Sequence, residues 1–244
     1  MLKVAEPPLT PALIRDRHER IMARLRNAAE AAARDPDGFR VVAVTKGFGP
    51  AVVRAAREAG LHRFGENRVQ EALAKIAAEP DAEWHLIGRL QANKARPAVR
   101  AFAMIHAVDS LDLLARLDLI ALEEGRSPAC LLEVNLTGEM TRAGFDAAWF
   151  GAEASRGGAL GAALAGLAAV RVSGLMGIAA PGVALSEARA VFAGLRRLRD
   201  RLADQIGRPL PELSMGMSAD AEAAVAEGAT LVRIGTAIFG PRPG

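Results

Sequence analysis

Short apolar runs alternate along this chain with longer segments in which apolar and charged residues mix. The runs are rich in Val, Ile and Leu on both faces, which is typical of strands buried in a parallel sheet. Eight strands are predicted in this way, at residues 40–45, 63–65, 84–87, 104–108, 130–135, 170–175, 212–215 and 231–234.

The segments between the strands are rich in Ala, Leu, Arg and Glu, and this composition favours helices. Helices are predicted at residues 50–59, 70–79, 110–124, 186–205 and 219–227. An opening helix is predicted at residues 10–34, where Thr10 and Pro11 form a suitable N-cap and first-turn pair. Segment 151–166, biased to Gly, Ala and Ser, is expected to be a loop plus a weak helix, with no function assigned.

This alternation of strands and helices predicts an α/β fold built on a parallel sheet. Eight units in about 250 residues favour a single closed (β/α)8 TIM barrel with an extra N-terminal helix. No linker-like segment divides the chain, so one domain is expected over residues 1–244. An open doubly wound sheet is the alternative, although no GxGxxG follows the first strand, which weakens a dinucleotide-binding interpretation.

Composition narrows the class of protein. No uninterrupted apolar run approaches the roughly 18 to 20 residues of a membrane-spanning helix, and the N-terminus lacks the order of a signal peptide. The single cysteine, Cys130, lies in an apolar run and is expected to be a buried thiol in a reducing cytoplasm. The 31 basic residues are interspersed with 28 acidic ones and aromatics make up 4%, so nucleic-acid binding is not expected. A monomer is expected, because no long apolar seam stands out beyond the helices that cover a barrel.

The C-terminal part of the chain carries the strongest indication of a ligand. Two successive strand ends, at Met215 to Ser218 and at residues 230–240, each lead into backbone suited to an anion. Gly235 lets the backbone approach a ligand, and Thr236 adds a hydroxyl at an expected helix start. A phosphorylated ligand fits this pattern.

Lys46 ends the first predicted strand, at the face of a barrel where active sites are built. There its amine would be partly desolvated, which lowers the pKa and suits attack on an aldehyde to form a Schiff base. An isolated lysine at a strand end more often extends to solvent, so its context decides.

That context is a set of polar residues at other strand ends. Asn67 follows the second strand, where a helix cap is the plainer interpretation, and His85 lies in the third, where a hydrogen-bonded core histidine is the plainer one. In a closed barrel the last strand pairs with the first, which brings the phosphate-suited backbone beside Lys46. The ligand that needs both is pyridoxal phosphate (PLP).

With these residues the chain resembles a known family, the pyridoxal phosphate homeostasis proteins, also called alanine-racemase-like PLP-binding proteins. The resemblance covers residues 41–240 and implies the fold of the alanine racemase N-terminal domain. Its most specific segments, after the lysine-bearing strand, are FGENRVQEA, WHLIGRLQANK, IHAVDS, EVNLTGE, GLMGIAAP and LSMGMSADAEAAVAEGATLVRIGTAIFG.

The resemblance implies a role for each matching residue. Lys46 would form the internal aldimine, and Arg233 would face the pyridine nitrogen of the cofactor. A guanidinium there disfavours protonation of that nitrogen, so the cofactor becomes a poor electron sink. The remaining residues implied for the cofactor site are Ser218, Gly235 and Thr236 at the phosphate, Asn67 near the ring oxygen, and His85 and Met215 in motifs near the pocket.

Four positions depart from the usual family pattern. Thr45 stands where serine is common, Arg68 where tyrosine is frequent, Arg89 where proline is usual and Ala92 where serine is usual. These changes put contacts around Arg68 and Arg89 in doubt, including any surface used by partners.

Two functions compete for such a site. A racemase would need a second base, which in alanine racemases is a tyrosine supplied with help from an additional β domain. This sequence has no tyrosine and leaves no room for that domain after residue 240, although His85 or a water could substitute. The expected function is therefore a carrier that binds PLP through Lys46 without strong catalysis, buffers it and supplies it to PLP-dependent enzymes and to amino-acid metabolism. A basic nucleic-acid-binding module is the third and weakest interpretation.

Overall fold

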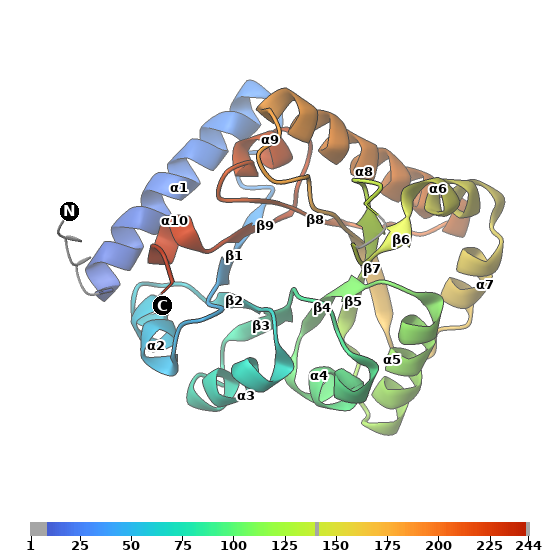
Figure 1. The fold of residues 1–244 in the computed structure, drawn as a ribbon, viewed down its shortest axis with the longest axis horizontal. Coiled ribbons are helices and arrows are strands. Elements are labelled where there is room, and N and C mark those ends of the chain that lie inside the picture. The colour runs from blue at the N-terminus through green and yellow to red at the C-terminus, as the bar shows by residue number, and fades with distance from the viewer. Residues whose placement is uncertain (1–8, 140–141, 243–244) are drawn as a thin grey trace.

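Eight parallel strands form a closed ring in the computed structural model, which describes residues 9–139 and 142–242 (Figure 1). β1 pairs with β2 on one side and β9 on the other, and β4 pairs with β5, so the ring closes. The predicted barrel is confirmed and the open sheet is excluded. The strands of the ring are β1 (Arg40–Val44), β2 (Arg63–Glu66), β3 (Glu83–Leu86), β4 (Met104–Val108), β5 (Ala129–Asn135), β7 (Arg171–Met176), β8 (Glu212–Met217) and β9 (Leu231–Ile234).

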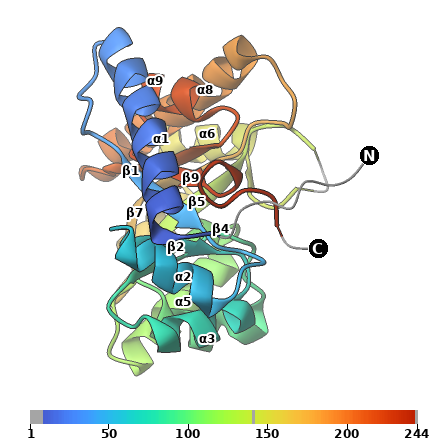
Figure 2. The ribbon, with the colours of Figure 1, turned by 90° about the vertical axis from the view of Figure 1, so that its left-hand side faces the viewer.

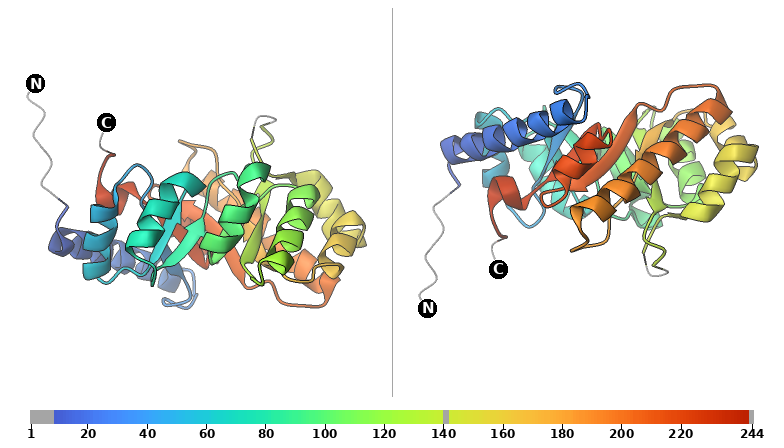
Figure 3. Two further views of the ribbon diagram at one scale, coloured as in Figure 1. Left: turned by 90° about the horizontal axis from the view of Figure 1, so that it is seen from below. Right: turned by 90° about the horizontal axis from the view of Figure 1, so that it is seen from above.

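Helices surround the ring and cover the outer face of the strands. Viewed from below, the helices that follow β1 to β4 lie outside the sheet, and viewed from above the first helix and the long helix after β7 do so (Figure 3). They are α1 (Pro11–Ala31), α2 (Pro50–Glu58), α3 (Val69–Ala78), α4 (Ala95–Ala101), α5 (Leu111–Glu123), α6 (Ala147–Arg156), α7 (Ala159–Ala165), α8 (Leu185–Ile206), α9 (Ala221–Ala226) and α10 (Thr236–Phe239).

The extra N-terminal helix α1 begins as its sequence predicts. Thr10 is the N-cap, its Oγ1 accepts the N–H of Leu13 at 3.2 Å, and Pro11 follows. The buried side chains of the helix recur at helical spacing, at Ile14, Ile21, Leu25 and Ala29. α1 therefore packs along the outside of the barrel, against α2, α9 and α10 (Figure 2).

Segment 151–166 differs from the expected loop plus weak helix, because two helices, α6 and α7, run through it. Asp146 caps α6 by accepting the N–H of Trp149 at 2.8 Å, and Gly157, in the left-handed conformation at φ +68°, ends it. Just before α6, the two-residue strand β6 (Phe145–Asp146) pairs with β5 beside the ring. These elements depend on local caps, which a compositional bias does not reveal.

α4 was also not predicted. It follows a short 3-10 turn, η1 (Ala92–Lys94), and carries Pro97 in its first turn. A proline there removes an N–H that has no partner within the helix in any case, so it does not prevent the helix.

The barrel encloses a second apolar cluster, separate from the large one between strands and helices. Its buried members lie on β1, β4, β5, β7 and β9 and include Val42, Met104, Leu131, Met176 and Leu231. Four buried polar side chains, His85, His106, Ser214 and Arg233, are hydrogen-bonded to one another inside the ring. Among residues 9–139 and 142–242, no helix has the length and apolar character needed to cross a membrane.

Candidate functional site

A cavity of about 330 Å³ opens at the carboxyl ends of β1, β2, β8 and β9. This volume lies within the range of small-molecule sites, roughly 300 to 1,000 Å³. Six of the eight predicted site residues line it together, namely Lys46, Asn67, Ser218, Arg233, Gly235 and Thr236.

Lys46 lies two residues past the end of β1 and is half-buried at the wall of the cavity. Burial lowers the pKa of its amine, and the positive charges of Arg242 and Arg233 lower it further, against the opposing effect of Glu66. A larger share of neutral amine is therefore present than on an exposed lysine, and the neutral amine is the nucleophile.

A buried ion pair supports the backbone just before Lys46. Nζ of Lys75 on α3 lies 2.6 Å from Oε1 of Glu66 and donates to the carbonyl of Thr45 at 2.8 Å. The hydroxyl of Thr45 donates to the same Glu66 oxygen at 2.5 Å. Side chains from β2 and α3 thus hold the end of β1, which fixes where the Lys46 side chain leaves the strand.

The turns after β8 and β9 build the next part of the wall, because β9 pairs with β1 beside Lys46. Gly216 interrupts the register of β8 with φ +86°, where a Cβ would lie 2.5 Å from Cβ of Ala224. Ser218 follows this bulge, and its Oγ lies 3.4 Å from the N–H of Ala237, in the first turn of α10. The first N–H groups of a helix have no partner within it, so backbone donors and the Ser218 hydroxyl converge on one end of the cavity.

Arg233 places a buried guanidinium in the cavity wall beneath these turns. Its Nη1 donates to Oγ of Ser214 at 2.5 Å and its Nη2 to the carbonyl of Gly177 at 3.1 Å. Burial lowers the pKa of Arg233 to about 10, against the attraction of Glu133 and Asp220, so the group stays charged at neutral pH. A cation therefore faces the cavity, and no carboxylate within residues 9–139 and 142–242 is in hydrogen-bond contact with it.

Asn67 reaches the cavity because the loops after β2 and β3 meet closely. A Cβ on Gly88 would lie 2.4 Å from the carbonyl oxygen of Asn67, so only glycine permits this approach. Arg68, not Asn67, is the N-cap of α3, which removes the plainer interpretation of Asn67 as a helix cap.

The structure places the other two predicted residues away from the cavity. His85 lies inside the barrel, fully buried, with both ring nitrogens in hydrogen bonds to His106 and Glu83. Met215 points from β8 into the outer apolar layer, because side chains alternate along a strand. The plainer interpretation of His85, a hydrogen-bonded core histidine, describes its surroundings.

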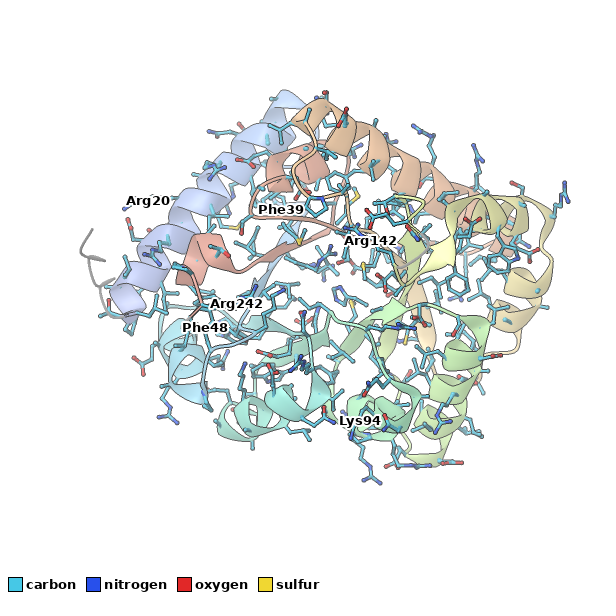
Figure 4. The ribbon with its side chains drawn as sticks, in the orientation of Figure 1. Arg20, Phe39, Phe48, Lys94, Arg142 and Arg242 are labelled. Carbon is cyan, nitrogen blue, oxygen red and sulfur yellow. The ribbon has the colours of Figure 1, made fainter. Side chains whose placement is uncertain are left out.

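Phe48 and Arg242 line the cavity and were missed in the sequence. A Cβ on Gly47, where φ is +79°, would lie 3.0 Å from Cδ of Arg242, so the absence of a side chain lets the arginine stem pass over the turn after β1. Figure 4 shows Phe48 and Arg242 side by side where the C-terminal segment passes the end of β1. The only signal for Arg242 is a lone basic residue just beyond the last motif.

Comparisons with known proteins agree with this architecture. Residues 18–243 match the family model described as alanine racemase, N-terminal domain. The pyridoxal phosphate homeostasis protein of Pseudomonas aeruginosa is 42% identical over 231 residues, covering 91% of this chain and 93% of the relative.

Solved structures are similar as well. PipY of Synechococcus elongatus PCC7942 with PLP bound is 42% identical, with a TM-score of 0.79, over 93% of this chain and all of PipY (100%). Alanine racemase from Bartonella henselae, at 15% identity and a TM-score of 0.71 over 96% of this chain and 60% of the racemase, shares the fold. The chain belongs to the alanine racemase N-terminal domain family and, within it, to the pyridoxal phosphate homeostasis proteins.

Proposed function

We propose that this chain is a PLP carrier: one PLP-binding barrel that holds the cofactor through Lys46 and contributes to PLP homeostasis without strong catalysis. The observation that carries the proposal is the charge of the cavity. Three cations, Lys46, Arg233 and Arg242, line it, and no Asp or Glu does so among the described residues. A small phosphorylated ligand with an electrophilic carbon complements such a site.

The residues of the cavity divide the work of binding. Ser218, Gly235 and Thr236 hold the phosphate group through a hydroxyl and backbone N–H groups at the start of α10. Arg233 would face the ring nitrogen of the cofactor, and Asn67 would lie near the ring oxygen; both residues line the cavity. Ile87 and Ile178 also line the cavity, and their apolar side chains can pack against an aromatic ring.

Lys46 supplies the covalent attachment. PLP brings an aldehyde carbon that condenses with a primary amine and releases one water molecule. The lowered pKa of Lys46 raises the fraction of amine ready for this bond at neutral pH. The half-buried position at the wall shields the attachment from bulk water.

Two features support a carrier over a racemase. Arg233 is a cation at neutral pH and disfavours a proton on the ring nitrogen, which weakens the cofactor as an electron sink. Among the described residues that line the cavity, Lys46 is the only titratable group other than the two arginines, and the sequence contains no tyrosine. His85, the substitute considered above, is engaged with His106 and Glu83 below the cavity.

In this role the chain acts as a monomer in the cytoplasm and hands PLP to PLP-dependent enzymes. A buried thiol at Cys130 and the absence of any second cysteine in the sequence support a reducing compartment.

The test is to incubate the protein with PLP, reduce it with borohydride and locate the added mass by peptide mass spectrometry. We expect the label on Lys46, together with a visible absorption band before reduction, and neither in Lys46→Ala. Lys94→Ala is the matched control, since Lys94 lies apart from Arg242 in Figure 4 and does not line the cavity. A label that persists in Lys46→Ala, or a wild-type protein that gains none, would refute the attachment.

The carrier role is tested separately, by chiral analysis after incubation of the loaded protein with L- and D-alanine. Turnover at ordinary enzyme rates, about 1 per second or faster, would favour the racemase.

A further inference from the structure

A continuous row of polar side chains crosses the interior of the barrel beneath the cavity. Glu83 and His85 come from β3, His106 from β4, Ser214 from β8 and Arg233 from β9. Oε1 of Glu83 lies 2.8 Å from Nε2 of His85, and Nδ1 of His85 lies 2.8 Å from Nε2 of His106. Nδ1 of His106 lies 2.8 Å from Oγ of Ser214, which accepts from Arg233 at 2.5 Å.

These contacts are not a consequence of strand pairing. β4 and β8 are not neighbours in the ring, so the bond from His106 to Ser214 spans the inside of the barrel. His85, His106 and Ser214 are fully buried. Buried polar groups are costly unless every member of such a network has a partner.

Only one direction of donation satisfies the whole row with neutral histidines. The carboxylate of Glu83 can only accept and the guanidinium of Arg233 can only donate, so with neutral histidines Ser214 accepts from Arg233 and gives its own proton to Nδ1 of His106. His106 then donates from Nε2 to Nδ1 of His85, and His85 donates from Nε2 to the carboxylate of Glu83. The opposite direction would require a protonated histidine or a protonated Glu83.

The charges around the row favour the neutral histidines. The hydrogen bond from His85 lowers the pKa of Glu83 to about 2, with burial opposing and Arg63 helping, so Glu83 is a carboxylate. Burial lowers the pKa of His85, opposed by Glu83 and assisted by Arg63 on β2 and Arg40 on β1. Burial holds the pKa of His106 well below its usual value, and the neighbouring His85 and Arg233 lower it further.

We propose that Glu83, His85, His106 and Ser214 are positioning residues for Arg233. Their one-way hydrogen bonds, from guanidinium to carboxylate, hold Nη1 on the side away from the cavity, while the carbonyl of Gly177 holds Nη2. The remaining N–H groups are thereby directed at the ligand. Without Ser214 as acceptor, the carbonyl of Gly177 alone would hold the guanidinium, which could then turn toward the phosphate end of the cavity. The identity of the ligand in this inference rests on the proposed function. The arrangement of the row does not depend on it.

The first experiment uses the cofactor-free wild-type protein. Nitrogen-15 NMR of the histidine side chains at pH 7 should find His85 and His106 neutral, with the proton on Nε2 and none on Nδ1. A proton on Nδ1 of either ring would overturn the proposal, whether or not the protein binds PLP.

The second experiment removes the link next to Arg233 with Ser214→Ala. The matched control is Ser173→Ala, because Ser173 lies on β7 and its hydroxyl has no hydrogen-bond partner in the described part of the chain. We expect Ser214→Ala to shift the His106 nitrogens and to change the nitrogen-15 signal of PLP labelled at the ring nitrogen. The affinity of the Ser214→Ala variant for PLP should fall about 3- to 10-fold, which is the change in binding constant expected for one lost hydrogen bond. Ser173→Ala should change none of these.

The outcomes separate the two proposals. If the ring-nitrogen signal of PLP and the affinity for PLP are the same in Ser214→Ala as in Ser173→Ala, the row does not position Arg233. Borohydride labelling of Lys46 should persist in both variants, and its absence from the wild type would refute the carrier while leaving the NMR test of the row in force.

Discussion

Replacing Lys75 by methionine tests the buried ion pair that supports Lys46. The change removes the ammonium that lies 2.6 Å from Glu66 and 2.8 Å from the carbonyl of Thr45. The Lys75 side chain is 4% exposed and that of Glu66 0%, so water cannot replace the lost partner. Methionine keeps most of the volume of the side chain, so the main loss is electrostatic.

The expected cost follows from leaving a charge buried without its partner. Breaking such a pair typically costs about 3 to 5 kcal/mol. For a chain of 244 residues, the entropy of unfolding near the midpoint is about 0.5 kcal/mol per degree, so the Tm should fall by about 6 to 10 °C. Urea titration followed by circular dichroism measures the free energy of unfolding independently.

The pH dependence identifies Glu66 as the source. Burial raises the pKa of Glu66 above its ordinary value, against the hydrogen bonds from Lys75 and Thr45, and losing Lys75 raises it further. A raised folded pKa means that the folded protein holds the proton more tightly than the unfolded chain does. The destabilisation should therefore be largest above the raised pKa and shrink as the pH falls through it.

The double variant Lys75→Met with Glu66→Gln is the control. It removes the buried charge and leaves an oxygen that accepts from Thr45, so it should recover at least about half of the lost free energy. A single variant that loses less than about 1 kcal/mol, or a double variant no more stable than the single one, would refute the reasoning.

Other predictions concern the frame of the barrel. Gly174→Ala should destabilise the folded protein by about 3 kcal/mol or more, the upper end of the usual cost of overpacking. The reason is that a Cβ at this position would lie 1.8 Å from the carbonyl oxygen of Glu212. Gly194→Ala, in α8 with no atom nearer than 3.9 Å, should instead stabilise by up to about 1 kcal/mol, and urea titration compares the two variants. Burial raises the pKa of Cys130 to about 12, so a thiol reagent should modify no cysteine in the folded protein and one after unfolding. Burial alone would raise the pKa of Asp118, but hydrogen bonds from three backbone N–H groups lower it below 3.8. The carboxylate therefore stabilises the folded state above that pH. The stability lost in Asp118→Ala, measured by the same titration, should diminish as the pH falls below 3.8.

The order of strands and helices was predictable because it depends on local composition. Buried parallel strands are apolar on both faces, and helices begin at caps such as Thr10 and Ser110, whose oxygens accept the N–H of Leu13 and Leu113. α4, β6 and the division between α6 and α7 were not predicted, because short elements depend on single residues such as Gly157. The eight strands, once counted, left a closed barrel as the favoured arrangement.

The sequence by itself determined the family, the barrel and the six residues that meet at the cavity. The barrel follows from the alternation of strands and helices, and the family and the six residues follow from short motifs at strand ends. Only the tertiary structure decided that His85 and Met215 lie elsewhere, that Arg242 crosses Gly47, and that His106 and Ser214 join Glu83 to Arg233. These contacts link strands that are distant in the chain and not always paired in the sheet. Their existence depends on which side chains face inward when the ring closes, and no local pattern records that.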